Sequence, residues 1–327
     1  MTVVLAEPLA EWLHAELGLA SPIAVARIGT GHSRAMFVAT AADGRRVVVR
    51  VEQGGVFGTS GAEECRVMRA LHAAGAPVAA ILQEEKTGAI LGNPFFVMEF
   101  VGGDSFVDGA PFVDGAPLVD GGGDERSVDS ETAASFVCEL HRLHCLDGAA
   151  FGFAMVPADP SEATPLQIER WLAVSRSAAE APIPLLEEAA AWLVHHAPPL
   201  ARLAVVHGDA GPGNFVHVGG RVVAVTDWEF AHLGDPAEDW GFCLAMRGAR
   251  TMSRAEWLAL FAEHAEFTMD DEGWRYWEAF NLFKGACANR TCLRLFEDGR
   301  NRAPNMAVIG TALHQVFLRR LVEIVHA

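Results

Sequence analysis

The sequence contains very little lysine and no cysteine pattern typical of a metal or redox site. Lys86 and Lys284 are the only lysines, so arginine carries nearly all of the positive charge. None of the six cysteines lies in a C-x-x-C spacing, which argues against zinc and favours reduced thiols in the cytoplasm. No apolar run reaches about 18 residues, which excludes a simple transmembrane helix. Because Glu7 and Glu11 interrupt the first apolar stretch and no basic flank precedes it, we expect no signal peptide.

Positive charge is scarce overall, and this limits the possible partners. The 327 residues have a net charge of −17, and residues 101–327 account for −15 of it. A surface that coats nucleic acid needs a basic face, so we expect neither a nucleic-acid partner nor a membrane partner. The length predicts two domains or two lobes, and 51% hydrophobic residues supply ample material for a core. The oligomeric state cannot be read from these features.

The first part of the chain, residues 1–101, reads as a small β-rich lobe. Apolar spacing predicts helices at 9–17 and 62–73, a hairpin strand at 47–51 after the Asp43-Gly44 turn, and a buried strand at 95–101. Residues 102–129 follow as a separate segment, in which a six-residue repeat occurs in three copies over 106–123. Three such short copies make no solenoid, so we expect a mobile insertion, with a lid over a substrate cleft as the alternative.

The remaining segment, residues 130–327, is predicted to be helical with one embedded hairpin. Helical spacing recurs at 132–146, 166–171, 185–194, 257–267, 274–292 and 306–325. The exception is the pair of short apolar runs at 215–218 and 222–225, which a Gly219-Gly220 turn joins. The predicted class is therefore α+β: a two-lobed fold with a β-rich N-lobe and a larger α-helical C-lobe.

Unusual polar residues flank this hairpin. Before it stands His207-Gly-Asp209-x4-Asn214, and after it stands Asp227-Trp-Glu229. Because a hairpin returns the chain to its starting point, we expect Asp209, Asn214 and Asp227 to converge. Two carboxylates and an amide oxygen suit a hard divalent cation and a proton acceptor. Phosphoryl transfer requires this set: one Asp as base, an Asn five residues later and a second Asp beyond the strands as metal ligands.

On these motifs the sequence resembles the aminoglycoside phosphotransferase and choline kinase-like family, whose fold is similar to that of protein kinases. The resemblance covers about residues 20–320. It implies that Asp209 is the catalytic base and that Asn214 and Asp227 bind Mg²⁺. Asp235 and Asp239, in the stretch after Asp227, are interpreted as structural braces of the site.

The same resemblance implies an ATP site in the small lobe. The phosphate-covering loop would include Gly31, His32 and Ser33. Arg50 stands where kinases have the lysine that grips the phosphates, and Glu64 on the next helix would orient it; the alternative is a surface ion pair. Met98 would back the adenine, while Glu99 and Val101 would offer backbone hydrogen bonds.

The leading prediction is therefore an ATP- and Mg²⁺-dependent kinase that phosphorylates a hydroxyl of a small molecule. The replacement of lysine by Arg50 keeps a second hypothesis open, a nucleotide-binding sensor without transfer activity. A third is a metal hydrolase with His207, Asp209 and His217 as ligands.

The acceptor stays open among aminoglycosides, choline or amino alcohols, sugars and hydroxyacyl-CoAs. The Asp-Trp-Glu form resembles the branch that accompanies acyl-CoA dehydrogenases, which implies a hydroxyacyl-CoA. The acidic large lobe favours a cation, although weakly. Four aromatic residues are either core or part of an acceptor pocket that could take a quaternary ammonium: Trp257, Trp274, Tyr276 and Trp277.

Overall fold

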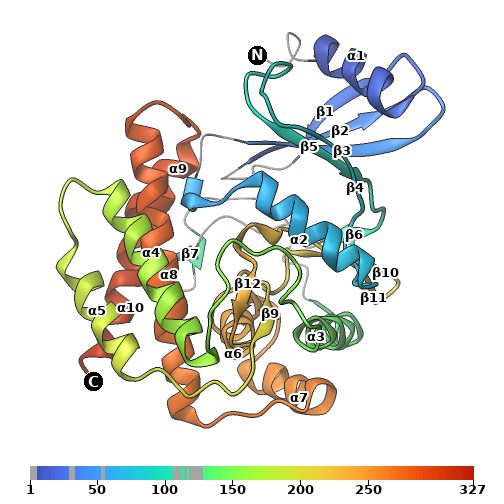
Figure 1. Ribbon diagram of the computed structural model, residues 1–327. Coiled ribbons are helices and arrows are strands. Elements are labelled where there is room, and N and C mark those ends of the chain that lie inside the picture. The colour runs from blue at the N-terminus through green and yellow to red at the C-terminus, as the bar shows by residue number, and fades with distance from the viewer. Residues whose placement is uncertain (1–5, 29–33, 53–55, 106–111, 114–115, 118–127) are drawn as a thin grey trace.

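The computed structural model describes residues 6–28, 34–52, 56–105, 112–113, 116–117 and 128–327. Figure 1 shows two lobes, with a sheet and its helices above a larger helical body. The expected α+β, two-lobed architecture is confirmed. Among the described helices, none has both the length and the apolar content that crossing a bilayer demands.

The small lobe is built on one antiparallel sheet of five strands in the order β1-β2-β3-β5-β4. Its elements are α1 (Ala6–Leu17), β1 (Ala24–Ile28), β2 (Arg34–Thr40), β3 (Arg46–Glu52), η1 (Val56–Gly58), α2 (Gly61–Ala73), β4 (Ile81–Glu85) and β5 (Phe95–Glu99). The strand predicted at 95–101 therefore ends at Glu99. The other predicted elements of this lobe are present with small shifts at their ends.

Alternation along β3 determines which side chains face the large lobe. Val47, Val49 and Val51 pack in the cluster that includes α1, whereas Val48 packs in the cluster that includes α2. Successive residues of a strand point to opposite faces, so Arg50 shares the face of Val48. The sequence of β3 thus places one arginine among valines on the side of the sheet that α2 covers.

The large lobe is mainly helical. Its helices are α3 (Ser130–His144), α4 (Ala163–Ala178), α5 (Pro184–His195), α6 (Ala237–Phe242), α7 (Arg254–Ala265), α8 (Asp271–Glu297), α9 (Pro304–Val308) and α10 (His314–Val325), with short turns η2 (Pro160–Glu162), η3 (Trp228–Phe230) and η5 (Gly248–Arg250). Two π-helical segments, η4 (Cys243–Arg247) and η6 (Ile309–Leu313), interrupt the helical stretches. Polar caps begin several helices: Asp129 accepts from the Thr132 N–H, and Ser253 and Glu256 form a capping box.

Short strands carry the polar motifs of the large lobe. They are β9 (Ala204–Val206), β10 (Phe215–Val218), β11 (Arg221–Val225) and β12 (His232–Gly234), with β6 (Asp104–Ser105) beside β10 and a small pair, β7 (Phe112–Val113) and β8 (Ala116–Pro117). The predicted hairpin is confirmed as β10 and β11. Beyond it, β9 pairs with β12, which brings the segment before Asp209 next to the segment after Asp227.

Helix α2 and the loop after it connect the two lobes. The Ala154 N–H donates to Glu63 Oε1 at 2.7 Å, and the Val225 N–H donates to the Pro77 carbonyl at 2.7 Å. Figure 1 shows α2 running across the interface between the sheet and the large lobe. The insertion predicted to be mobile or a lid lies almost entirely outside the described residues.

Docking of α1 on the sheet gives a test of the small-lobe core. Leu13 of α1 is fully buried in the cluster that includes Val49 of β3. We expect Leu13→Ala to lower the free energy of unfolding by about 2–5 kcal/mol, because the truncated site cannot collapse completely. Glu11→Ala, on the exposed face of the same helix, should change it by less than about 0.5 kcal/mol. Urea unfolding measures both, and equal midpoints for the two variants would contradict this packing.

Candidate active site

Two of the three predicted site residues are in direct contact on the loop between β9 and β10. The Asn214 Nδ2 donates to the Asp209 backbone carbonyl at 2.8 Å and to Asp209 Oδ2 at 2.7 Å. Both residues are buried, with 9% of Asp209 and 6% of Asn214 exposed. The interval of five residues therefore closes a tight loop in which the amide fixes the orientation of the carboxylate.

Asp227 follows β11 and lies beside this loop. The N–H of its neighbour Thr226 donates to the Asn214 carbonyl at 2.9 Å, which ties the two ends of the hairpin together. Asp227 itself adopts a left-handed conformation, with φ at 68°. Such backbone geometry costs a non-glycine residue about 1–3 kcal/mol and is concentrated at functional sites. The convergence expected from the hairpin is present.

Arg50, on β3 of the small lobe, connects that lobe to Asp227. Its Nη1 lies 3.0 Å from Glu64 Oε1, and its Nη2 contacts Asp227 Oδ1. Burial by itself would lower the pKa of Arg50, but the nearby carboxylates of Glu64, Asp227 and Glu229 raise it above the ordinary value. The guanidinium is thus a permanent buried charge between α2 and the hairpin, and the alternative of a surface pair is wrong.

The interaction with Arg50 also affects the pKa of Asp227. Burial would raise the pKa of its carboxyl group, but the charge and hydrogen bond of Arg50, with a further contribution from Arg247, hold it below its usual range. The Asp227 carboxylate is therefore ionised throughout the neutral range. An ionised carboxylate is the form that binds a hard cation.

The backbone before Asp209 is held by a second carboxylate. Asp239 accepts hydrogen bonds from the backbone N–H groups of His207 and Gly208, both at 2.8 Å, and from His144 Nε2 at 2.9 Å. The predicted brace role of Asp239 is confirmed by these contacts. Asp235 acts differently, because its Oδ1 accepts a hydrogen bond at 2.8 Å from the N–H of Ala237, the first residue of α6.

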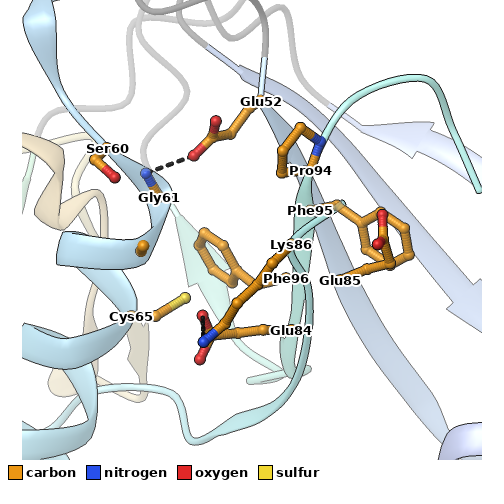
Figure 2. A pocket seen from close by; sticks show the side chains of 11 residues that line it. Glu52, Ser60, Gly61, Cys65, Glu84, Glu85, Lys86, Pro94, Phe95 and Phe96 are labelled. Carbon is orange, nitrogen blue, oxygen red and sulfur yellow. Dashed lines mark hydrogen bonds and ion pairs between the residues drawn. The ribbon is translucent and has the colours of Figure 1, made fainter. Parts of the chain in front are cut away.

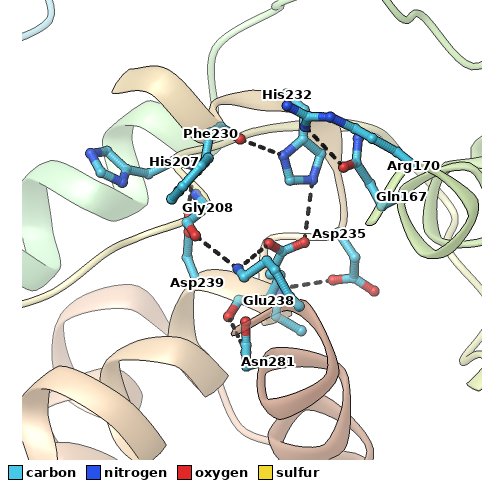
Figure 3. A network of polar contacts seen from close by, with 12 residues as sticks. Gln167, Arg170, His207, Gly208, Phe230, His232, Asp235, Glu238, Asp239 and Asn281 are labelled. Carbon is cyan, nitrogen blue, oxygen red and sulfur yellow. Dashed lines mark hydrogen bonds and ion pairs between the residues drawn. The ribbon is translucent and has the colours of Figure 1, made fainter. Parts of the chain in front are cut away.

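A buried lysine completes this support. Figure 3 shows the surrounding polar network from close by, with Gly208, Glu238 and Asp239 labelled. Lys284 Nζ donates to the Gly208 carbonyl at 2.8 Å and to Glu238 Oε1 at 2.7 Å. His232 Nε2 lies 3.2 Å from the other oxygen of Glu238. Gly208 has φ at +80°, and a Cβ there would lie 2.7 Å from the Phe230 carbonyl oxygen. Only glycine fits at this position. The hydrogen bonds of Lys284 and this close backbone packing together fix the loop immediately before Asp209.

A cation that no sequence motif indicates contacts the predicted base. Arg247, at the end of η4, donates from Nε to Asp209 Oδ1 at 3.1 Å and from Nη2 to Asp209 Oδ2 at 2.5 Å. This is a bidentate guanidinium–carboxylate pair. Arg247 follows Asp209 by 38 residues and belongs to no local motif, so no signal in the sequence could have identified it.

The structure describes only some of the residues predicted to bind the nucleotide. Gly31, His32 and Ser33 lie outside the described residues. Met98 is buried in the cluster that faces α2, and Val101 lies beyond the end of β5. The Glu99 N–H donates to the Ala80 carbonyl at 2.9 Å, so this donor is already used within the small lobe.

The donors at the site fit Mg²⁺ rather than zinc. Asn214 gives its Nδ2 to Asp209, so its oxygen is the atom suited to ligate a metal, and Asp227 supplies a carboxylate that is 34% exposed. Magnesium prefers oxygen ligands and needs few from the protein, since water and phosphate complete its shell.

The metal hydrolase with His207, Asp209 and His217 as ligands gains no support. The Asp209 N–H donates to His207 Nδ1 at 3.2 Å, and His207 Nε2 donates to the Thr226 carbonyl at 2.8 Å. Both ring nitrogens are therefore occupied by backbone groups. In the described part of the chain, no three His, Cys, Asp or Glu side chains gather as a metal site.

The four aromatic residues considered for an acceptor pocket belong to the core. Each is at most 5% exposed. Trp257 Nε1 donates to the Gly248 carbonyl at 2.9 Å, and the Tyr276 hydroxyl donates to the Leu193 carbonyl at 3.0 Å. The polar atoms of Trp257 and Tyr276 thus hold the fold together, and the burial of all four side chains favours the core over a box for a quaternary ammonium.

A separate cavity of about 240 Å³ lies in the small lobe between the start of α2 and strands β4 and β5 (Figure 2). Glu52, Cys65 and Glu84 are among its lining residues, and Glu52 accepts from the Gly61 N–H at 2.6 Å. None of Asp209, Asn214 and Asp227 lines it. This cavity is therefore not the place where the predicted catalytic groups meet.

These features define a two-lobed kinase-like fold with a polar site at the end of a hairpin. The model of the phosphotransferase enzyme family matches residues 24–280. The chain therefore belongs to this family of phosphotransferase enzymes.

Two curated relatives are acyl-CoA dehydrogenase family members. The chain is 28% identical to member 10 of Mus musculus over 305 residues, which cover 86% of this chain and 27% of the relative. It is 30% identical to member 11 of Gallus gallus over 183 residues, which cover 55% of this chain and 22% of the relative. The chain thus spans about a quarter of the length of the curated relatives it matches.

Solved structures share the fold along nearly the whole chain. A Ralstonia eutropha protein named for the aminoglycoside phosphotransferases has a TM-score of 0.66 at 24% identity, with 98% of each chain covered. A thermostable mutant of aminoglycoside phosphotransferase APH(4)-Ia, in a ternary complex with AMP-PNP and hygromycin B, has a TM-score of 0.64 at 15% identity, with 98% of this chain and 99% of that chain covered. Macrolide 2'-phosphotransferase MphH from Brachybacterium faecium has a TM-score of 0.59 at 19% identity, with 94% and 97% covered. At these identities the likeness shows the fold.

The contacts of Asp239 with the loop before Asp209 give a pH-dependent prediction. Burial would raise the pKa of Asp239, but His144, His207 and the backbone hydrogen bond lower it below its ordinary value. A carboxyl group of this kind stabilises the fold above its unfolded pKa of about 4, and the stabilisation is lost as the pH falls through the folded value. We expect Asp239→Asn to cost about 3–5 kcal/mol at neutral pH, because it unpairs buried donors.

Urea unfolding of wild type and Asp239→Asn at a series of pH values checks this expectation. The difference in free energy of unfolding between wild type and Asp239→Asn should narrow as the pH falls below about 5. Asp298→Asn, at the exposed end of α8, is the control and should cost less than about 1 kcal/mol. A gap that does not change with pH would contradict the assignment.

Proposed function

We propose that the chain is an ATP- and Mg²⁺-dependent phosphotransferase that moves the γ-phosphoryl group to a hydroxyl of a small molecule. The observation that carries this proposal is the contact of Asn214 with Asp209 beside Asp227, on a hairpin that the small lobe touches through Arg50. In this assignment residues 1–101 hold the nucleotide, and residues 130–327 supply the base, the metal ligands and the acceptor site.

The proposed reaction assigns one role to each group. Asp209 accepts the proton of the acceptor hydroxyl while that oxygen bonds to phosphorus and the bond to the ADP oxygen breaks. Asn214 and Asp227 would hold Mg²⁺, which neutralises charge on the phosphate oxygens when bound. Arg50, whose charge is buried beside Asp227, would hold the phosphates from the small-lobe side. The loop of Gly31, His32 and Ser33 would cover them, with Met98, Glu99 and Val101 at the adenine.

The acceptor class remains a choice among aminoglycosides, choline or amino alcohols, sugars and hydroxyacyl-CoAs. Hygromycin B in the APH(4)-Ia complex supports the first class, and the acyl-CoA dehydrogenase relatives support the last. Measuring ADP production with members of each class present assigns the acceptor directly.

A nucleotide-binding sensor is the second candidate, because an arginine replaces the phosphate-gripping lysine of kinases and already contacts Asp227. Asp227→Asn separates the two functions. Stabilisation by ATP and Mg²⁺ is expected of both, so thermal unfolding alone cannot decide. Slow release of ADP by the wild type that disappears in Asp227→Asn would support transfer. Nucleotide binding without ADP release, over all four acceptor classes, would support the sensor.

The role of Asp209 has its own test. We expect Asp209→Ala to lower turnover by about 10²–10⁴-fold, because the hydroxyl then has no proton acceptor. Affinity for ATP and Mg²⁺ should stay near that of the wild type, which calorimetry can measure. Asp298→Ala, on the exposed end of α8, is the matched control and should leave both values unchanged. Unchanged turnover in Asp209→Ala would remove this residue from the reaction.

A further inference from the structure

Several contacts hold Arg247, the cation that pairs with the predicted base Asp209, in position. Arg247 ends a π-helical segment, a rare geometry that occurs often at functional sites. The residue after it, Gly248, is held by the Trp257 indole N–H, and a Cβ at Gly248 would lie 2.7 Å from Trp257 Nε1. A Cβ at Gly211 would lie 2.7 Å from the Arg247 Cβ. The arginine stem thus packs against the loop that carries Asp209.

The other cationic side chains near this loop are paired with other carboxylates. The loop 207–214 contains neither lysine nor arginine. Arg50 lies between Glu64 and Asp227, and Lys284 is buried against Glu238. In the described chain, Arg247 is therefore the cation in contact with Asp209.

The position of Asp209 determines what Arg247 can reach. In an in-line transfer the acceptor oxygen lies between the base and the phosphorus atom. A guanidinium that holds both oxygens of the base is then adjacent to the group in transfer.

We propose that Arg247 is a catalytic residue that donates hydrogen bonds to the transferring phosphoryl group and stabilises its negative charge. The proposal rests on the phosphotransferase function above. Arg247 would supply in the same chain the positive charge that an arginine finger brings to other phosphoryl transfers. Its pairing with Asp209 keeps the guanidinium in place before the phosphate arrives, so little reorganisation is needed during reaction.

Binding measurements with Arg247→Ala, Arg247→Lys and the control Arg254→Ala test this proposal. Arg254 is exposed at the start of α7, so the control removes the same charge away from the site. Calorimetry with Mg²⁺ gives the affinities for AMP-PNP, which carries a γ-phosphoryl group, and for ADP, which lacks one. We expect Arg247→Ala to weaken AMP-PNP by about tenfold more than ADP, and Arg254→Ala to leave the ratio unchanged. Arg247→Lys should keep part of the preference.

Kinetics complete the test. ADP release by Arg247→Ala should fall by about 10³-fold or more, and added guanidinium ion, below unfolding concentrations, should restore part of it. Equal loss of AMP-PNP and ADP affinity, or an effect only on the KM of the acceptor, would overturn the role of Arg247. A wild-type chain that does not bind AMP-PNP with Mg²⁺ would instead overturn the proposed function itself.

Discussion

The buried ion pairs of Arg50 are the interaction on which the site depends. One guanidinium contacts Glu64 on α2 and Asp227 beyond the hairpin, so it fixes the small lobe against the large lobe. Two carboxylates offset the cost of burying this charge, and the removal of either would leave it under-compensated. Because Asp227 adopts a strained left-handed conformation, the surrounding contacts must hold it there. The same contacts align the face of β3 with the loop that carries Asp209 and Asn214.

A second constraint is that the loop between β9 and β10, which carries Asp209, is buried in the large lobe and must be held rigidly there. Buried backbone N–H groups need partners, and Asp239 supplies them for the two residues before Asp209. Lys284 satisfies the Gly208 carbonyl while Glu238 compensates its charge. Asp209 is thus presented by a backbone whose polar groups are satisfied, and its own oxygens are oriented by Asn214 and Arg247. Held in this way, the Asp209 carboxylate is pre-organised, which suits the role of base that we propose for it.

Much of this arrangement is local and could be predicted from the sequence. The valine run around Arg50 predicts a strand, and the polar residues on both sides of a Gly-Gly turn predict that the hairpin brings them together. Pairings between distant segments have no such signal: β9 with β12, and Arg247 with Asp209 across 38 residues. The aromatic residues of α7 and α8 were ambiguous because helical spacing suits both a core and a pocket, and burial decides for the core. The contact of Arg50 with Asp227 likewise required the fold.

The central claim is that Asn214 and Asp227 hold a divalent cation and its nucleotide next to Asp209. A crystal structure of the chain with AMP-PNP and Mn²⁺, read by its anomalous signal, tests this most directly. The account predicts a manganese peak bound by the Asn214 amide oxygen, an Asp227 carboxylate oxygen and phosphate oxygens, with the γ-phosphoryl group facing Asp209. A nucleotide bound elsewhere, or a metal without either of these two ligands, would contradict it.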